Sequence, residues 1–205
     1  MQKTRVWTIP NLISILRLAC VPVFLWLLWG KDEPVAAAAL LAVLGATDWV
    51  DGYIARHFDQ GSELGKILDP TADRVMLLAA TIALLVADLP VAVDIVLWLV
   101  LAREILVAGA TIILAVAGAR RIDVVWAGKA GTLAVMFALP LFLWADALDD
   151  GAWRAFVWFA GWCFAISGLA LGYYAAAAYV PAAREALRSG RAARTRGNRN
   201  AEVHG

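Results

Sequence analysis

Hydrophobic residues along this chain form long, nearly unbroken blocks, unlike the alternating or amphipathic patterns of a soluble fold. Each of six blocks is close to the ~20 residues that a helix needs to cross a bilayer. Short stretches rich in Gly, Pro, Asp or Lys separate the blocks and are typical of turns. The pattern predicts an all-α integral membrane protein with six transmembrane helices over Leu12–Trp29, Val35–Ile54, Thr71–Ala87, Val91–Val116, Trp126–Ala145 and Trp153–Val180.

Composition supports a lipid environment. Of the 205 residues, 62% are hydrophobic, whereas a soluble domain is about half apolar. The net charge is only +1, so no overall field favours nucleic acid. The Arg-rich end of the chain also lacks the aromatic residues on which bases stack. We predict one transmembrane domain over residues 1–183 and a basic tail over 184–205, which is disordered or lies as a helix on anionic lipid head groups.

Lys and Arg are sorted between the two sets of connections. They concentrate at the amino terminus, in the second-to-third and fourth-to-fifth connections, and in the tail. The other connections are mainly acidic. Because cytoplasmic loops carry an excess of Lys and Arg, both termini are predicted to lie in the cytoplasm, with the chain in the cell's inner or plasma membrane. An even number of membrane spans also places both termini on the same side of the membrane.

Four aspartates mark the second and third predicted helices. Asp48 and Asp51 are three positions apart, and Asp69 and Asp73 are four apart, so each pair shares a helix face. The short connection through Gly61 allows the two helices to run antiparallel. Four carboxylates are then expected to converge near the cytoplasmic ends of these helices.

Such a cluster needs compensation, because like charges repel and burial disfavours ionisation. Mg²⁺ accepts carboxylate oxygens and leaves positions for substrate phosphate. Two such ions would clamp a diphosphate and activate an attacking hydroxyl, and a partly free carboxylate would accept the proton. Nearby, Gly52, Ala55 and Gly65 remove side chains where a bulky nucleotide would approach the backbone. Arg56 offers a cationic fork for phosphate.

The whole pattern is Asp-x-x-Asp-Gly-x-x-Ala-Arg, eight residues, then Gly-x-x-x-Asp-x-x-x-Asp. It resembles the signature of the CDP-alcohol phosphotransferases, and six spans with cytoplasmic termini also match that family. Every fixed position is present, namely Asp48, Asp51, Gly52, Ala55, Arg56, Gly65, Asp69 and Asp73.

The resemblance implies a CDP-diacylglycerol-dependent phosphatidyltransferase of phospholipid biosynthesis. Cytidine would bind near Gly52, Ala55 and Gly65, with the diphosphate on two Mg²⁺ or Mn²⁺ ions held by the four aspartates. Asp73 would deprotonate an acceptor hydroxyl, which attacks the phosphorus attached to diacylglycerol, and CMP would leave. Members of this family are typically homodimers, so a homodimer is expected here.

Other segments resemble the phosphatidylglycerophosphate synthase and cardiolipin synthase branch. They are Thr8–Arg17, the Arg103-Glu104 pair, and Gly128-Lys129-Ala-Gly131-Thr132, which is similar to Gly-Lys-x-Lys-Thr. The predicted acceptor is therefore glycerol 3-phosphate, with Lys129, Arg103 and Arg120 as its contacts. Gly131 replaces the second Lys and removes a cation, which favours phosphatidylglycerol as the alternative acceptor. Inositol-type acceptors are less expected.

Charges inside the predicted helices have two interpretations. Arg17, Arg103 and Glu104 either contact substrate or pair inside the bundle. Because adjacent helix positions do not face each other, Arg103 and Glu104 are expected to have different partners. Lys129 is explained equally well by topology.

Three other classes of protein fit the pattern less well. A transporter would place ionisable groups near the midplane and often contain inverted halves. An intramembrane prenyltransferase would have more spans and two separated acidic motifs. A non-catalytic scaffold would not need the complete set of aspartates.

Overall fold

The computed structural model describes the backbone of residues 9–58, 65–116 and 126–203, and side chains over 12–47, 71–113 and 126–178. Across these described ranges the regular structure is entirely helical. The elements in chain order are α1 (Ile9–Leu25), the π-helix η1 (Trp26–Gly30), α2 (Pro34–Phe58), α3 (Gly65–Leu85), α4 (Val91–Val116), α5 (Trp126–Asp146) and α6 (Ala152–Val203).

These helices follow the six predicted blocks closely, with two differences. The third helix begins at Gly65 instead of Thr71, because its first turns contain polar residues that hydropathy does not detect. The last helix continues to Val203, so it includes most of the tail after residue 183, which was predicted to be disordered or to lie as a helix on lipid head groups. Residues 184–203 are rich in Ala, Arg, Glu and Leu, which are strong helix formers.

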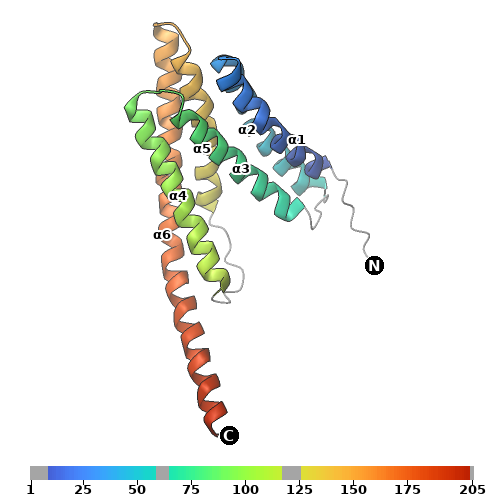
Figure 1. Ribbon diagram of the computed structural model, residues 1–205, viewed down its shortest axis with the longest axis vertical. Coiled ribbons are helices and arrows are strands. Elements are labelled where there is room, and N and C mark those ends of the chain that lie inside the picture. The colour runs from blue at the N-terminus through green and yellow to red at the C-terminus, as the bar shows by residue number, and fades with distance from the viewer. Residues whose placement is uncertain (1–8, 59–64, 117–125, 204–205) are drawn as a thin grey trace.

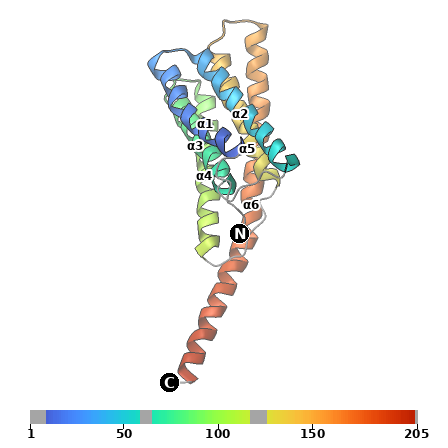
Figure 2. The ribbon, with the colours of Figure 1, turned by 90° about the vertical axis from the view of Figure 1, so that its right-hand side faces the viewer.

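The helices run alternately in opposite directions (Figure 1). The connections after η1, α3 and α5 lie at one end of the bundle. The end of α2 and the beginning of α3 lie toward the other end, which we call the motif end. Beyond it α6 projects alone (Figures 1 and 2). The turns before α2 and after α3 each contain an aspartate with positive φ, Asp32 and Asp88, both at 57°. Aspartate tolerates this left-handed conformation better than most residues.

Three stretches in the described residues are long and apolar enough to cross a membrane: Leu12–Gly30, Trp126–Asp146 and Ala152–Ala178. The first half of α2, Pro34–Thr47, is a shorter apolar segment. Several apolar helices support an integral membrane protein. The α4 helix contains the charged residues Asp94, Arg103 and Glu104, and neither α3 nor α4 is among these three stretches. The count of six membrane spans therefore stays a prediction.

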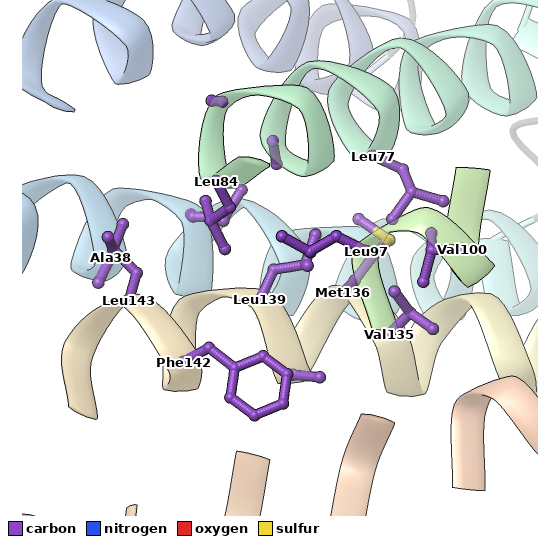
Figure 3. Packing of buried hydrophobic residues seen from close by; sticks show 14 of the residues in the cluster. Ala38, Leu77, Leu84, Leu97, Val100, Val135, Met136, Leu139, Phe142 and Leu143 are labelled. Atoms are coloured by element: carbon purple, nitrogen blue, oxygen red, sulfur yellow. The ribbon is translucent and has the colours of Figure 1, made fainter. Parts of the chain in front are cut away.

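The apolar core lies where α2, α3, α4 and α5 face one another (Figure 3). Phe142 also contacts α6, where its ring packs against Trp158 and Trp162 at centroid distances of 5.6 and 5.2 Å. In lipid such contacts stabilise mainly by van der Waals packing, because the surrounding acyl chains are equally apolar. The core residues labelled in the figure are Ala38, Leu77, Leu84, Leu97, Val100, Val135, Met136, Leu139, Phe142 and Leu143.

Candidate active site at the motif end

The inner faces of α3, α4 and α5 change from apolar to polar or small within one turn of the core. Residues three or four positions apart share a helix face, so each change extends a buried stripe toward the motif end. The stripes concerned contain Met76, Val100 and Val135, which are at most 5% exposed. The residues that follow them toward the motif end are, in the same order, Asp73, Arg103 and Gly131.

Asp73 is the motif aspartate whose side chain the structure describes. It lies on α3 with its side chain 25% exposed, and one carboxylate oxygen, Oδ1, accepts a hydrogen bond from Nη1 of Arg17 on α1. The Arg17 side chain is only 1% exposed. A guanidinium in this setting requires a charged partner, because an uncompensated buried charge is strongly destabilising. Pairing inside the bundle was one of the two interpretations of Arg17 that the sequence allowed, and the sequence did not identify Asp73 as the partner.

The remaining motif residues are placed by their helices alone. Since α2 ends at Phe58 and α3 begins at Gly65, the connection spans at most about 25 Å. The side chains of these residues lie outside the described ones, so the convergence of four carboxylates stays a prediction. Among the described side chains there is no cluster of three or more metal-binding groups. The residues concerned are Asp48, Asp51, Gly52, Ala55 and Arg56 on α2, and Gly65 and Asp69 on α3.

Arg103 and Glu104 pair with each other, contrary to the expectation of separate partners. Nη1 of Arg103 donates to Oε1 of Glu104, and Nη2 donates to the carbonyl oxygen of Gly128 on α5 at 3.2 Å. Both residues are 8% exposed. The prediction failed because the long Arg side chain can turn back to its neighbour, and a buried guanidinium needs a carboxylate to compensate its charge. Nε of Arg103 has no hydrogen-bond partner in the described part of the chain.

Glycines allow α5 and α6 to approach closely beside this pair. A Cβ atom added at Gly131 would lie 2.8 Å from the backbone nitrogen of Gly172 and 2.9 Å from the carbonyl oxygen of Gly168. A Cβ at Gly172 would lie 2.9 Å from Nε of Arg103. Position 131 therefore faces the α6 backbone, with no room for a longer side chain in this packing.

The three predicted acceptor contacts have different surroundings. Arg103 is buried and engaged as described above, while Lys129 on α5 is exposed. Arg120 lies outside the described residues. The acceptor-binding role of all three stays a prediction.

One known protein family matches most of this chain. The family model for CDP-alcohol phosphatidyltransferase matches residues 7–173, which include every motif position and Arg17. The chain belongs to the CDP-alcohol phosphatidyltransferase family. It is therefore an enzyme of the class that transfers phosphatidyl groups, and its motif end is the candidate active site of that phosphatidyltransferase.

The phosphatidyltransferase resembles relatives of two kinds. It is 39% identical over 194 residues to a CMP-forming cardiolipin synthase of Streptomyces coelicolor, covering 92% of this chain and 88% of that protein. It is 34% identical over 149 residues to a CDP-diacylglycerol–glycerol-3-phosphate 3-phosphatidyltransferase of Escherichia coli, covering 67% and 78%. An enzyme of Haemophilus influenzae with the same name is 33% identical over 141 residues, covering 67% and 76%.

Proposed function

We propose that this protein transfers the phosphatidyl group of CDP-diacylglycerol to phosphatidylglycerol, giving cardiolipin and CMP. Family membership supports the donor and the reaction type. The observation that carries the choice of acceptor is the packing of Gly131 against Gly168 and Gly172. The likeness to the Streptomyces coelicolor cardiolipin synthase over most of both chains supports the same choice.

The acceptor argument starts from position 131, where the related motif has a second lysine. A lysine ammonium there would offer a point charge to an acceptor phosphate. In this chain α6 fills that space, since even a Cβ would approach its backbone to less than 3.0 Å. An acceptor whose reacting end is an uncharged glycerol needs no second cation. Phosphatidylglycerol presents such an end, whereas glycerol 3-phosphate carries a free phosphate.

The residues that would hold divalent metal ions are Asp48, Asp51, Asp69 and Asp73. Their carboxylates are the hard oxygen ligands that Mg²⁺ and Mn²⁺ prefer, and Asp73 reaches the inner face of the bundle. Two bound ions would neutralise the diphosphate and stabilise charge that develops at the transferred phosphorus.

In the proposed reaction, Asp73 accepts the proton of the acceptor's terminal hydroxyl. The hydroxyl oxygen forms a bond to the phosphorus that carries diacylglycerol, and the bond from that phosphorus to the bridging oxygen of CMP breaks. Gly52, Ala55 and Gly65 leave room for the nucleotide, while Arg56 binds its phosphates. We place this chemistry at the cytoplasmic face and propose a homodimer in the plasma membrane.

Glycerol 3-phosphate is the second candidate acceptor, because the E. coli and H. influenzae relatives are named for it. Lys129 is exposed near the start of α5, where a phosphate would meet it. Arg103 and Arg120 complete this alternative acceptor site.

The deciding experiment measures CMP release by purified protein in mixed micelles that contain Mg²⁺ and CDP-diacylglycerol. Parallel reactions receive phosphatidylglycerol, glycerol 3-phosphate, inositol phosphate or no acceptor. We expect CMP release with phosphatidylglycerol alone, together with cardiolipin as the lipid product. Release with glycerol 3-phosphate alone would overturn the choice of acceptor. No release with any alcohol would overturn the enzymatic proposal.

A further inference from the structure

One buried arginine reaches the proposed catalytic carboxylate from a helix outside the aspartate motif. Arg17 belongs to the inner face of α1, with the buried residues Ser14 one turn before it and Phe24 two turns after it. These residues are 0% and 2% exposed, and Arg17 itself is 1% exposed. Packing on both sides therefore fixes the position from which the guanidinium reaches Asp73 on α3.

Stability alone is a poor reason for this contact. Taking a guanidinium out of water is costly, and attraction to one carboxylate repays that cost only where the geometry is favourable. Well-packed apolar residues often replace a buried ion pair without loss of stability. The chain instead places the charge beside an aspartate to which the reaction gives a chemical role.

We propose that Arg17 is a positioning residue for Asp73. Its Nη1 holds Oδ1 of the carboxylate, which fixes the side-chain rotamer and directs the group toward the acceptor hydroxyl. The planar guanidinium gives this contact a defined direction that an ammonium group would not. This inference rests on the proposed function, because it requires Asp73 to be the base.

The test compares Arg17→Gln and Arg17→Lys with the wild type in the CMP-release assay. We expect Arg17→Gln to lower kcat about 100-fold, since small displacements of catalytic groups have effects of this order. KM for CDP-diacylglycerol should change less than about threefold, because substrate binding is left intact. Arg17→Lys should have a kcat about tenfold higher than that of Arg17→Gln, because lysine restores the positive charge but not the planar guanidinium group. A wild-type kcat in Arg17→Gln would overturn the proposal.

A double variant separates positioning from a general structural effect. If Arg17 acts through Asp73, adding Arg17→Gln to Asp73→Asn should lower kcat by less than about threefold further. A further 100-fold loss in that background would contradict the proposal. Arg154→Gln is the matched control, because Arg154 pairs with Asp150 at the opposite end of the bundle. It should retain wild-type kcat.

Two readouts besides activity complete the design. Thermal unfolding of each variant shows whether it is folded at the assay temperature. If Arg17→Gln is unfolded there, Arg17→Lys carries the test, and wild-type kcat in that variant then overturns the proposal. Counting bound Mn²⁺ by electron paramagnetic resonance should give equal numbers for wild type and Arg17→Gln. Loss of Mn²⁺ in Arg17→Gln would overturn a role confined to positioning. Absence of CMP release from the wild type would instead overturn the proposed function.

Discussion

Two buried arginines of this bundle, Arg17 and Arg103, have similar burial but different partners. They are 1% and 8% exposed, and each forms an ion pair inside a long helix bundle. Arg17 reaches across from α1 to Asp73 on α3, whereas Arg103 pairs with Glu104 beside it on α4. Burial of a charge therefore does not identify its role. The two arginines differ in where the partner lies: Arg17 contacts a motif aspartate on another helix, whereas Arg103 contacts its neighbour on the same helix.

The second pair also connects three helices. Arg103 donates to the carbonyl oxygen of Gly128 on α5, and that oxygen also accepts from Oγ1 of Thr132 at 3.0 Å. On α6, Gly172 leaves the space that the Arg103 side chain occupies. This arrangement explains Arg103 as a structural tie between α4, α5 and α6, without requiring contact with the acceptor.

The largest expected effect is at the partner of Arg17. Asp73→Asn keeps the shape of the side chain but removes both the base and the charge. We expect kcat for CMP release to fall about 1000-fold, within the range usual for loss of a general base. The rate is to be measured below the unfolding temperature of the variant, since Arg17 also loses its partner. If Asp73→Asn retains a tenth of the wild-type kcat, Asp73 is not the base. The partner of Arg17 would then have no more catalytic importance than the partner of Arg103.

The Arg103–Glu104 pair should affect stability more than chemistry. Glu104→Gln leaves a buried guanidinium uncompensated, so we expect a loss of about 3–5 kcal/mol in the free energy of unfolding. Replacing both residues, as Arg103→Met with Glu104→Leu, should restore most of that loss. Unfolding of the purified variants in detergent measures both effects. A double variant that is stable but has a strongly raised KM for the acceptor would assign Arg103 to acceptor binding instead.

The glycine crossing beside Arg103 should be sensitive to a single methyl group. Gly131→Ala places a Cβ against the α6 backbone, so the helices must separate, at an expected cost of about 1–3 kcal/mol. Gly109→Ala on α4 is the matched control, because a Cβ there meets nothing within 4 Å. That change should be neutral or stabilise by about 0.5–1 kcal/mol through helix propensity. Equal unfolding midpoints for the two variants would show that α5 and α6 do not require this close approach.

The smallest effect is expected for an ion pair at the protein surface. Arg154 pairs with Asp150, whose side chain is 94% exposed, so water screens the interaction. Nε of Arg154 also donates to the carbonyl oxygen of Ala145 at 3.2 Å. Arg154→Gln should therefore lower the free energy of unfolding by about 0.5–1 kcal/mol and leave kcat unchanged. A loss of stability as large as that of Glu104→Gln would mean that burial does not determine how much the ion pairs of Arg103 and Arg154 contribute to stability.

The sequence by itself determined the helices of this protein and the spacing of its motif. Apolar blocks located the six α-helices of the described residues, and the helix ends were correct to a few residues wherever a block bordered a turn. Hydropathy missed the first turns of α3, because Gly65 to Pro70 includes Lys66 and Asp69. It also gave no sign that α6 continues to Val203, since that helix depends on propensity and not on apolar residues. Apolar blocks and motif spacing are both local properties of the chain, so the sequence alone is enough to recognise them.

Only the tertiary structure decided which polar groups meet. Arg17 and Asp73 are 56 positions apart, and their contact depends on how α1 and α3 are rotated against each other. In the sequence, Gly131 is notable only because it replaces a lysine of the related motif. In the fold, Gly131 packs against the backbone of Gly168 and Gly172 on α6. Helix rotation and crossing are set by packing over many residues at once. A linear pattern of residues does not contain that information.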